Sequence, residues 1–184
     1  MTCTLVLGGA RSGKSAYAEQ LAIDSHKEVV YIATAQAGDA EMATRIAHHR
    51  RQRPQHWVTV EEPLALAATL QQWAQPDRLI LVDCLTLWLT NLLFGDATAL
   101  PDVGDIPLPE RFTRERAALL DILPHTPGDL VLVSNEVGLG IVPWGAVSRC
   151  FADEAGRLNQ AVAQRADRAV FLAAGLPLVL KDHA

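Results

Sequence analysis

Six short apolar runs, separated by longer segments with helical spacing, constrain the fold more than any other feature of the chain. The runs are nearly continuous in apolar residues rather than alternating, which indicates strands buried on both faces. A parallel sheet covered by helices on each side buries its strands in this way, so the pattern predicts an α/β fold with a mostly parallel sheet and helices on both faces. The predicted strands are residues 4–7, 29–33, 57–60, 79–82, 130–133 and 169–172. The predicted helices are residues 14–25, 39–53, 64–74, 85–94, 109–123 and 145–166.

Composition places the chain among compact globular proteins. It has 184 residues, 49% of them apolar and 20% charged, which suits one well-buried core, so we expect a single domain over residues 1–184. The net charge of −5 argues against a surface built to hold nucleic acid or an anionic membrane. No segment approaches the roughly 20 apolar residues of a membrane span, and the first residues lack a basic leader and a cleavage site. We therefore expect a cytoplasmic protein.

The cysteines and one stretch rich in Pro, Gly and Asp give further expectations about the fold. Cys3, Cys84 and Cys150 lie far apart and outside any CxxC or Cys/His spacing, so neither a disulfide framework nor a structural zinc site is expected. Their side chains are predicted to be small core residues. Residues 95–109 have few helix or strand formers and predict a surface excursion whose removal leaves the core nearly undisturbed.

The segment LVLGGARSGKS matches the pattern GxxxxGK[ST], directly after a predicted strand and directly before a predicted helix. Glycines let the backbone turn so that successive N–H groups point at phosphate oxygens, next to the positive end of the following helix. Lys14 would supply a positive charge to the β- and γ-phosphates, and the Ser15 hydroxyl would bind the Mg²⁺ that bridges them. A glycine-rich turn with a chance Lys-Ser is the alternative. The motif and its context predict a P-loop NTPase of RecA-like architecture.

Two further carboxylates are predicted at the carboxyl edge of the sheet, where ligands of α/β proteins bind. Asp83 directly follows the run 79–82 and is the first choice for holding the metal through water, while its alternative role is to cap the helix that begins at Leu85. Glu136 follows the run 130–133, within the segment SNEVGLG. The glycines of that segment suggest a loop that closes on the substrate, and a plain connecting turn is the alternative.

Two features reduce the number of possible classes of nucleotide-binding protein: the absence of one motif and the presence of a basic segment. No NKxD-type segment for reading guanine is present, so a Ras-like switch is not expected, and a small-molecule kinase is the better default than a motor ATPase. Residues 45–53 hold four of the thirteen arginines and two of the six histidines, which indicates an anionic partner. A histidine there could be a charge clamp, a general acid or a nucleophile. The alternative is a solvated basic helix face or a patch that meets RNA.

Five motifs of the chain together resemble a known family, the bifunctional adenosylcobinamide kinase/adenosylcobinamide-phosphate guanylyltransferases of cobalamin biosynthesis. They are GGARSGKS at 8–15, YIATAQ at 31–36, DAEMATRIAHHRRQRPQHW at 39–57, DCLTLWLTNLL at 83–93 and SNEVGLGIVP at 134–143. The resemblance spans essentially the whole chain. It implies phosphorylation of the aminopropanol hydroxyl of adenosylcobinamide by ATP or GTP, followed by transfer of GMP from GTP onto that phosphate with release of pyrophosphate.

The resemblance also implies roles for individual residues. His48 is the histidine that receives the guanylyl group, so the expected catalytic residues are His48 and Lys14. The expected metal ligands are Ser15 and Asp83. A shift of one residue would exchange His48 with His49, or Glu61 with Glu62. The expected nucleotide-binding residues are Gly8, Gly9, Ala10, Arg11, Ser12, Gly13, Lys14, Ser15, Ala33, Thr34, Ala35, His49, Arg50, Arg51, Gln52, Glu61 and Asp83.

The partners implied by the resemblance are adenosylcobinamide, adenosylcobinamide phosphate, and GTP or ATP together with Mg²⁺. No nucleic acid is expected, and the chain is expected to form a homo-oligomer such as a trimer. The residues by themselves leave two other functions open. These are a P-loop kinase of another small-molecule alcohol and a nucleotide-dependent module that binds RNA through its basic segment.

Overall fold

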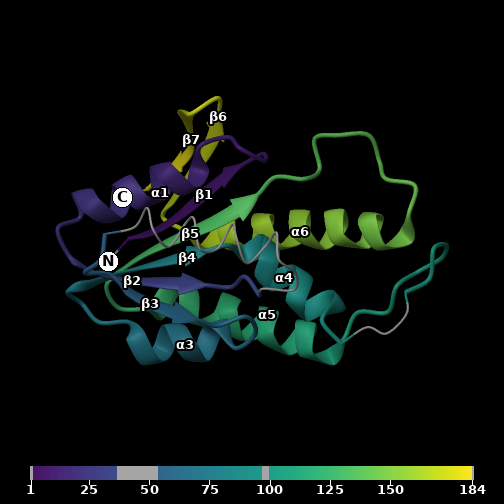
Figure 1. The fold of residues 1–184 in the computed structure, drawn as a ribbon, viewed down its shortest axis with the longest axis horizontal. Coiled ribbons are helices and arrows are strands. Elements are labelled where there is room, and N and C mark those ends of the chain that lie inside the picture. The colour runs from purple at the N-terminus through teal and green to yellow at the C-terminus, as the bar shows by residue number, and fades with distance from the viewer. Residues whose placement is uncertain (1, 37–53, 97–99, 184) are drawn as a thin grey trace.

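The computed structural model describes residues 2–36, 54–96 and 100–183, and these residues form one seven-stranded sheet with the order β3-β2-β4-β5-β1-β6-β7 (Figure 1). The strands are β1 (Cys3–Gly8), β2 (Glu28–Ala33), β3 (Val58–Glu61), β4 (Arg78–Asp83), β5 (Asp129–Asn135), β6 (Arg168–Ala173) and β7 (Leu176–Asp182). The helical elements are α1 (Lys14–Asp24), α3 (Leu66–Trp73), α4 (Leu85–Phe94), α5 (Glu110–Ile122), the 3₁₀ turn η1 (Leu123–His125) and α6 (Ala146–Arg165). The predicted helix over residues 39–53 lies outside the described residues.

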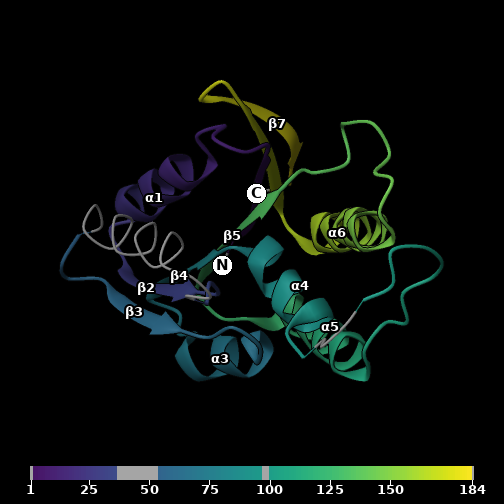
Figure 2. The same cartoon turned by 45° about the vertical axis from the view of Figure 1, so that its right-hand side comes forward.

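Helices cover both faces of the sheet, as the apolar runs predict. Helix α1 packs on one face through Ala18 and Ala22, whereas α3, α4, α5 and α6 cover the other face (Figure 2). The first six strands pair in parallel, and only β7, among the described strands, runs antiparallel to its neighbour. The prediction of a mostly parallel α/β sheet is therefore confirmed.

The larger core cluster is built around α4, which is apolar on nearly all of its sides. Trp88 is completely buried, and its indole N–H donates to the carbonyl of Leu64 at 2.8 Å, so the one polar atom of the ring has a partner in the interior. Burying a side chain of this size contributes on the order of 3 kcal/mol or more to folding. The α4 segment thus fixes the position of the loops at the carboxyl edge of the sheet.

The two edge strands depart from the sequence expectations. Strand β3 has a partly exposed pattern, so the expected burial on both faces is wrong there, because an edge strand lacks a neighbour and part of its cover. Strand β7 was not predicted. The apolar run LPLVL contains Pro177, and a proline argues against a strand except at a sheet edge. The first five residues of β7 are exposed.

The excursion at residues 95–109 lies on the surface, as predicted, and its described residues are mostly exposed. It is tied to the rest of the fold through the carbonyl of Asp102, which accepts the N–H of Ala146 at 3.1 Å, and through an ion pair of 2.9 Å between Asp96 and Arg111. Cys3 and Cys84 are buried core residues, as expected, whereas Cys150 is only partly buried. No helix in the described ranges has both the length and the apolar character needed to cross a membrane.

Candidate nucleotide site

The phosphate loop connects the buried end of β1 to the start of α1. Gly13 has φ +95°, a conformation that residues with a side chain rarely adopt, and its carbonyl accepts the N–H of Tyr17 at 3.0 Å to begin the helix. The Lys14 ammonium donates to the carbonyl of Gly9 at 3.1 Å, which folds the side chain back over the loop. An added Cβ at Gly9 would meet nothing within 4 Å, so this part of the loop opens outward. The loop therefore has the backbone turn and the lysine placement that phosphate binding needs.

The loop is supported from behind by β6 and by the turn that follows it. A Cβ added at Gly8 would lie 2.7 Å from the carbonyl oxygen of Leu172, so glycine is required there by close approach of two backbones. Gly175, at φ +78° in the turn between β6 and β7, donates its N–H to the carbonyl of Ser12 at 2.9 Å. A Cβ at Gly13 would lie 3.1 Å from the Gly175 Cα. The turn between β6 and β7 thus supports the phosphate loop, and only the dipeptide Ala174-Gly175 indicates that turn in the sequence.

Three neighbouring strands end in register at the same edge. Ala33 of β2 pairs with Glu61 of β3 on one side and with Asp83 of β4 on the other. Gly8 pairs with Asn135 at the end of β5, which lies between β4 and β1. The expected nucleotide residues of four separate segments are therefore brought to one edge of the sheet, where ligands of parallel α/β proteins bind.

Asp83 is positioned by a hydrogen bond rather than by a helix terminus. Its Oδ2 accepts the hydroxyl of Tyr31 at 2.7 Å, and the residue at the N-cap of α4 is Cys84, which makes no side-chain cap. Burial lowers the pKa of the Lys14 ammonium from its usual value, and the negative charge of Asp83 acts in the opposite direction. The helix-cap role for Asp83 is wrong, because Cys84 occupies the N-cap position of α4.

Thr34 is completely buried and holds the ends of β2 and β4 together. Its hydroxyl donates to the carbonyl of Cys84 at 2.7 Å and accepts the N–H of Cys84 at 3.0 Å. Its carbonyl accepts the side-chain amide of Asn91 at 2.8 Å. The hydroxyl of Thr34 is therefore used within the protein, while Ala33 and Ala35 on either side of it are partly exposed.

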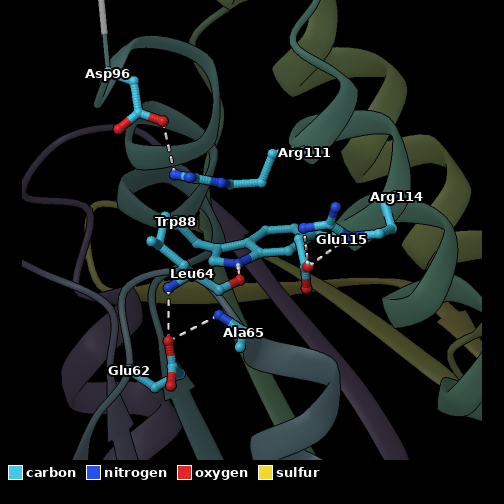
Figure 3. A network of polar contacts seen from close by, with 8 residues as sticks. All are labelled: Glu62, Leu64, Ala65, Trp88, Asp96, Arg111, Arg114 and Glu115. Carbon is cyan, nitrogen blue, oxygen red and sulfur yellow. Dashed lines mark hydrogen bonds and ion pairs between the residues drawn. The ribbon is translucent and has the colours of Figure 1, made fainter.

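The adjacent carboxylates Glu61 and Glu62 have different surroundings. Glu62 Oε1 accepts the backbone N–H groups of Leu64 and Ala65 at 2.8 and 2.7 Å, and so satisfies the start of the segment that leads into α3 (Figure 3). Glu61 is exposed at the end of β3. Glu62 is thus engaged with the backbone before α3, and Glu61 is the more exposed of the two carboxylates, so the role of Glu61 in nucleotide binding stays a prediction.

Glu136 lies at the carboxyl edge, as predicted, and directly beside the phosphate loop. Its backbone N–H donates to the carbonyl of Gly8 at 3.0 Å, and its carboxylate accepts the N–H of Gly138 at 2.5 Å. The preceding residue, Asn135, donates its N–H to the Thr86 hydroxyl at 2.7 Å and accepts the amide of Asn159 at 3.2 Å through its carbonyl. The segment after β5 therefore starts from a fixed point next to the loop.

The residues present fit a nucleotide with a hard cation. Ser12 Oγ and Asn135 Oδ1 are buried polar atoms without a hydrogen-bond partner in the described part of the chain, and both belong to the segments that border the phosphate loop. Ser15, in the first turn of α1, and Asp83 offer the oxygen donors that Mg²⁺ prefers. Within the described residues no group of three or more His, Cys, Asp or Glu side chains could hold a metal by itself. A cation here would take its remaining ligands from nucleotide phosphates and water.

The basic segment of residues 45–53 lies outside the described residues. This applies to His48, His49, Arg50, Arg51 and Gln52, so their expected roles stay predictions that rest on sequence alone.

A phosphate loop between the first strand and the first helix, at the carboxyl edge of a mostly parallel sheet, defines the class of P-loop NTPases. Solved structures agree with this class. An ATPase from the type III secretion system of pathogenic bacteria superposes with a TM-score of 0.56 at 13% identity, over 97% of this chain and 56% of that chain. The ATPase EscN from the type III secretion system of enteropathogenic E. coli gives a TM-score of 0.51 at 15% identity, over 94% of this chain and 43% of that one. At these identities the likeness concerns the fold alone.

Sequence relatives narrow the class to one family. The family described as cobinamide kinase / cobinamide phosphate guanyltransferase matches residues 4–180. The bifunctional adenosylcobalamin biosynthesis protein CobP of Pseudomonas aeruginosa is 58% identical over 97% of both chains. The corresponding protein CobU of Escherichia coli K12 is 44% identical, over 96% of this chain and 98% of its own length. The chain therefore belongs to the family of cobinamide kinases/cobinamide phosphate guanylyltransferases, and it is a transferase of cobalamin biosynthesis.

Proposed function

We propose that residues 1–184 act as a single domain that carries both reactions of the family, with the phosphates of ATP or GTP bound by residues 8–15. The observation that carries this proposal is the position of Lys14, at the start of α1 and with its ammonium donating to the carbonyl of Gly9 within the phosphate loop. The N–H groups of the loop and the positive end of α1 add to the charge of the lysine. Ala33, Ala35 and Glu61 border the same edge and are proposed to contact the nucleoside.

Ser15 and Asp83 would hold Mg²⁺, which when bound neutralises charge on the β- and γ-phosphates. Asp83 is suited to this position because Tyr31 fixes the orientation of its carboxylate. Because the side chain of Asp83 is short, we assign it to the metal through water rather than to the ribose or base.

In the kinase reaction, the hydroxyl oxygen of the cobinamide side chain attacks the γ-phosphorus, the bond to the nucleoside diphosphate breaks, and the hydroxyl proton passes to water. Lys14 and the loop N–H groups stabilise the charge that moves onto the leaving diphosphate. Because the phosphate loop is held rigidly against β6 and Gly175, these donors keep their direction during the reaction.

In the guanylyl transfer, a neutral imidazole nitrogen of His48 attacks the α-phosphorus of GTP and pyrophosphate leaves. The phosphate oxygen of cobinamide phosphate then attacks the same phosphorus, which releases the histidine and forms GDP-cobinamide. Two displacements through the histidine replace a direct reaction between GTP and cobinamide phosphate, which are both anionic. Arg50 and Arg51 would screen the negative charge of these two reactants. This role of His48 rests on the resemblance of its segment to the family.

The transfer step is tested by the fate of labelled phosphorus. GTP labelled at the α-phosphate should leave label on the denatured protein, in a bond that acid breaks and base leaves intact, whereas label at the γ-phosphate should leave none. His48→Asn should abolish the adduct and the guanylyl transfer but retain much of the kinase activity. Loss of the adduct in His49→Asn alone would move the nucleophile by one residue. Persistence of the adduct in both variants would refute a covalent histidine in this segment.

The kinase step is tested at Lys14. Lys14→Ala should lower both reactions and weaken Mg-nucleotide binding in calorimetry. Lys27→Ala is a matched control. Lys27 pairs with Asp129 at 2.7 Å where β2 and β5 begin, which is the edge of the sheet opposite the phosphate loop. If Lys14→Ala bound Mg-nucleotide as tightly as the parent, the assignment of the phosphate loop would be wrong.

The family match favours this function over the two alternatives, a kinase of another alcohol and a module that binds RNA. A homo-oligomer such as a trimer and a cytoplasmic location also belong to the proposal, and light scattering of the purified protein tests the first of them.

A further inference from the structure

The segment that connects β5 to α6 exposes an unusual amount of apolar surface. We call residues 137–144 the apolar loop. Leu139 is 82% exposed, Ile141 95%, Val142 72% and Trp144 96%, and Val137 is also exposed. Single exposed apolar side chains are common, but a continuous group of this size usually marks a binding surface.

The apolar loop begins next to the nucleotide site. Glu136, the residue before it, donates its N–H to the carbonyl of Gly8, the first residue of the phosphate loop, at 3.0 Å. In Figure 1 the segment leaves the end of β5 beside the phosphate loop and passes over α6. At about 3.4 Å for each residue, eight residues reach at most ~27 Å from this point. An acceptor that places one hydroxyl at the terminal phosphate can therefore lie against this loop.

Part of the apolar loop covers a small apolar groove. The groove has a volume of about 350 Å³ and is lined mainly by Val137 and Pro143 of the loop, Phe94 of α4, and Val147 and Phe151 of α6. This volume is at the lower end for a ligand pocket. The groove is large enough to bind an edge or a substituent of a large ligand. The exposed side chains of the apolar loop outside the groove would contact the rest of that ligand.

Polar contacts hold the backbone of the loop in place. Arg149 of α6 donates to the carbonyls of Pro143 and Trp144, and Glu136 accepts the N–H of Gly138. The apolar side chains are therefore presented to solvent by an anchored backbone and are not folded into the core. A preorganised surface of this kind reduces the entropy that a ligand must overcome on binding.

We propose that the apolar loop and its groove bind the corrin macrocycle of the cobinamide acceptor, with Trp144 lying against the ring system and the groove taking its methyl-bearing edge. This inference rests on the proposed function, because that function supplies the acceptor. The match is chemical: the corrin ring of cobinamide carries methyl groups among its amide side chains, and its phosphate-accepting hydroxyl lies on a flexible side chain. The apolar loop follows Glu136, whose backbone N–H donates to the carbonyl of Gly8 in the phosphate loop.

The test measures cobinamide binding directly. Cobinamide absorbs visible light, so equilibrium dialysis reports its affinity, and a fluorescent GTP analogue reports nucleotide binding separately. Trp144→Ala and Ile141→Ser should each weaken cobinamide binding at least about tenfold and leave the affinity for the GTP analogue unchanged. Leu180→Ser is the matched control, because Leu180 is also an exposed apolar residue, 57% exposed on β7, and its change should affect neither affinity.

A conservative variant separates contact from folding. Trp144→Phe should keep an affinity close to that of the parent, because an aromatic ring remains, but cobinamide should quench less of the tryptophan fluorescence. The other three tryptophans, Trp57, Trp73 and Trp88, are buried or partly buried and remain in this variant.

Three results would overturn the inference. Unchanged cobinamide affinity in both Trp144→Ala and Ile141→Ser would remove the loop from the acceptor site while leaving the proposed function intact. A lower assembly mass of these variants in light scattering would assign the surface to a second copy of the chain instead. Absence of cobinamide binding in the parent protein would contradict the proposed function itself.

Discussion

The Tyr31 hydroxyl donates a hydrogen bond of 2.7 Å to Asp83 Oδ2, and so a core residue of β2 orients the carboxylate at the end of β4. Tyr31 is only 2% exposed, whereas Asp83 reaches the surface of the site. The hydrogen bond therefore restricts the orientation of the carboxylate that we assign to the metal.

Tyr31→Phe should lower the unfolding free energy by about 1 kcal/mol, because one hydrogen bond is lost and water can replace it at Asp83. Its larger effect should be a higher Mg²⁺ concentration for half-maximal kinase rate, since the carboxylate loses its orientation. The measurement is the kinase rate over a Mg²⁺ series. Tyr17→Phe changes the other of the two tyrosines in the chain and should leave the Mg²⁺ dependence as it is. The same Mg²⁺ dependence in Tyr31→Phe and the parent would contradict this role.

Thr34→Val should lower the unfolding free energy by about 2 kcal/mol, measured by urea denaturation. Valine has the same shape but no hydroxyl, so the buried N–H of Cys84 loses its acceptor. The carbonyl of Cys84 keeps the N–H of Trp88 as a partner at 3.2 Å. Thr34→Ser retains the hydroxyl and should recover most of the loss. An equal loss in Thr34→Ser would show that the methyl group contributes as much as the hydroxyl, and unchanged stability of Thr34→Val would contradict the role of the hydroxyl.

Gly13→Ala should be more harmful than Gly104→Ala, although both glycines have φ +95°. The positive φ alone costs about 1–2 kcal/mol for alanine. At Gly13 the added Cβ would also lie 3.1 Å from the Gly175 Cα, whereas at Gly104 it would meet nothing within 4 Å. Gly13→Ala should therefore lose stability in thermal unfolding and also bind the fluorescent GTP analogue more weakly. Equal effects of the two changes on stability and binding would mean that the hairpin contact does not constrain the loop.

The apolar runs predict all six parallel strands, the edge strand β3 included, but neither the edge strand β7 nor the order of the strands. Buried strands such as β4 carry continuous apolar runs because both of their faces are covered, and these runs were found to within one or two residues. Strand β7 is exposed, is interrupted by Pro177 and is held mainly by backbone pairing with β6, which leaves little trace in side-chain patterning.

In the candidate site, too, some features could be predicted from the sequence and others could not. The phosphate loop and Asp83 could be predicted because the chemistry requires particular side chains at fixed spacing. The support from Gly175 and the anchoring of Asp83 by Tyr31 could not, because both are contacts between segments that are distant in sequence and depend on strand order. The distinction between Glu61 and Glu62 likewise needed the position of α3.

Asp129 should give the protein a stability that depends on pH. Burial by itself would raise the pKa of this carboxyl, but the hydrogen bond and charge of Lys27, together with the N–H of Thr2, lower it below its ordinary value of 3.8. The stabilisation is therefore complete above pH 3.8 and is lost as the pH falls through the lower value in the folded protein.

Asp129→Asn should be less stable than the parent by about 1 kcal/mol at pH 7, and the difference should shrink as the pH falls below 4 in urea denaturation at several pH values. In a Lys27→Met background the effect of Asp129→Asn at pH 7 should be smaller, because the main partner is already absent. A difference that is constant over the whole pH range would rule out the ion pair as its source.

The contact between the turn at Gly175 and the phosphate loop has a consequence for how the protein is made. The phosphate loop, residues 8–15, is among the first parts of the chain to be synthesised. However, β1 lies between β5 and β6 in the sheet, and the loop that follows β1 accepts a hydrogen bond from Gly175. We therefore expect that a nascent chain that contains the motif but lacks residues 168–175 does not bind nucleotide. Binding competence should arise only after residues 168–175 have left the ribosome, which couples the activity of the enzyme to the synthesis of its distal end.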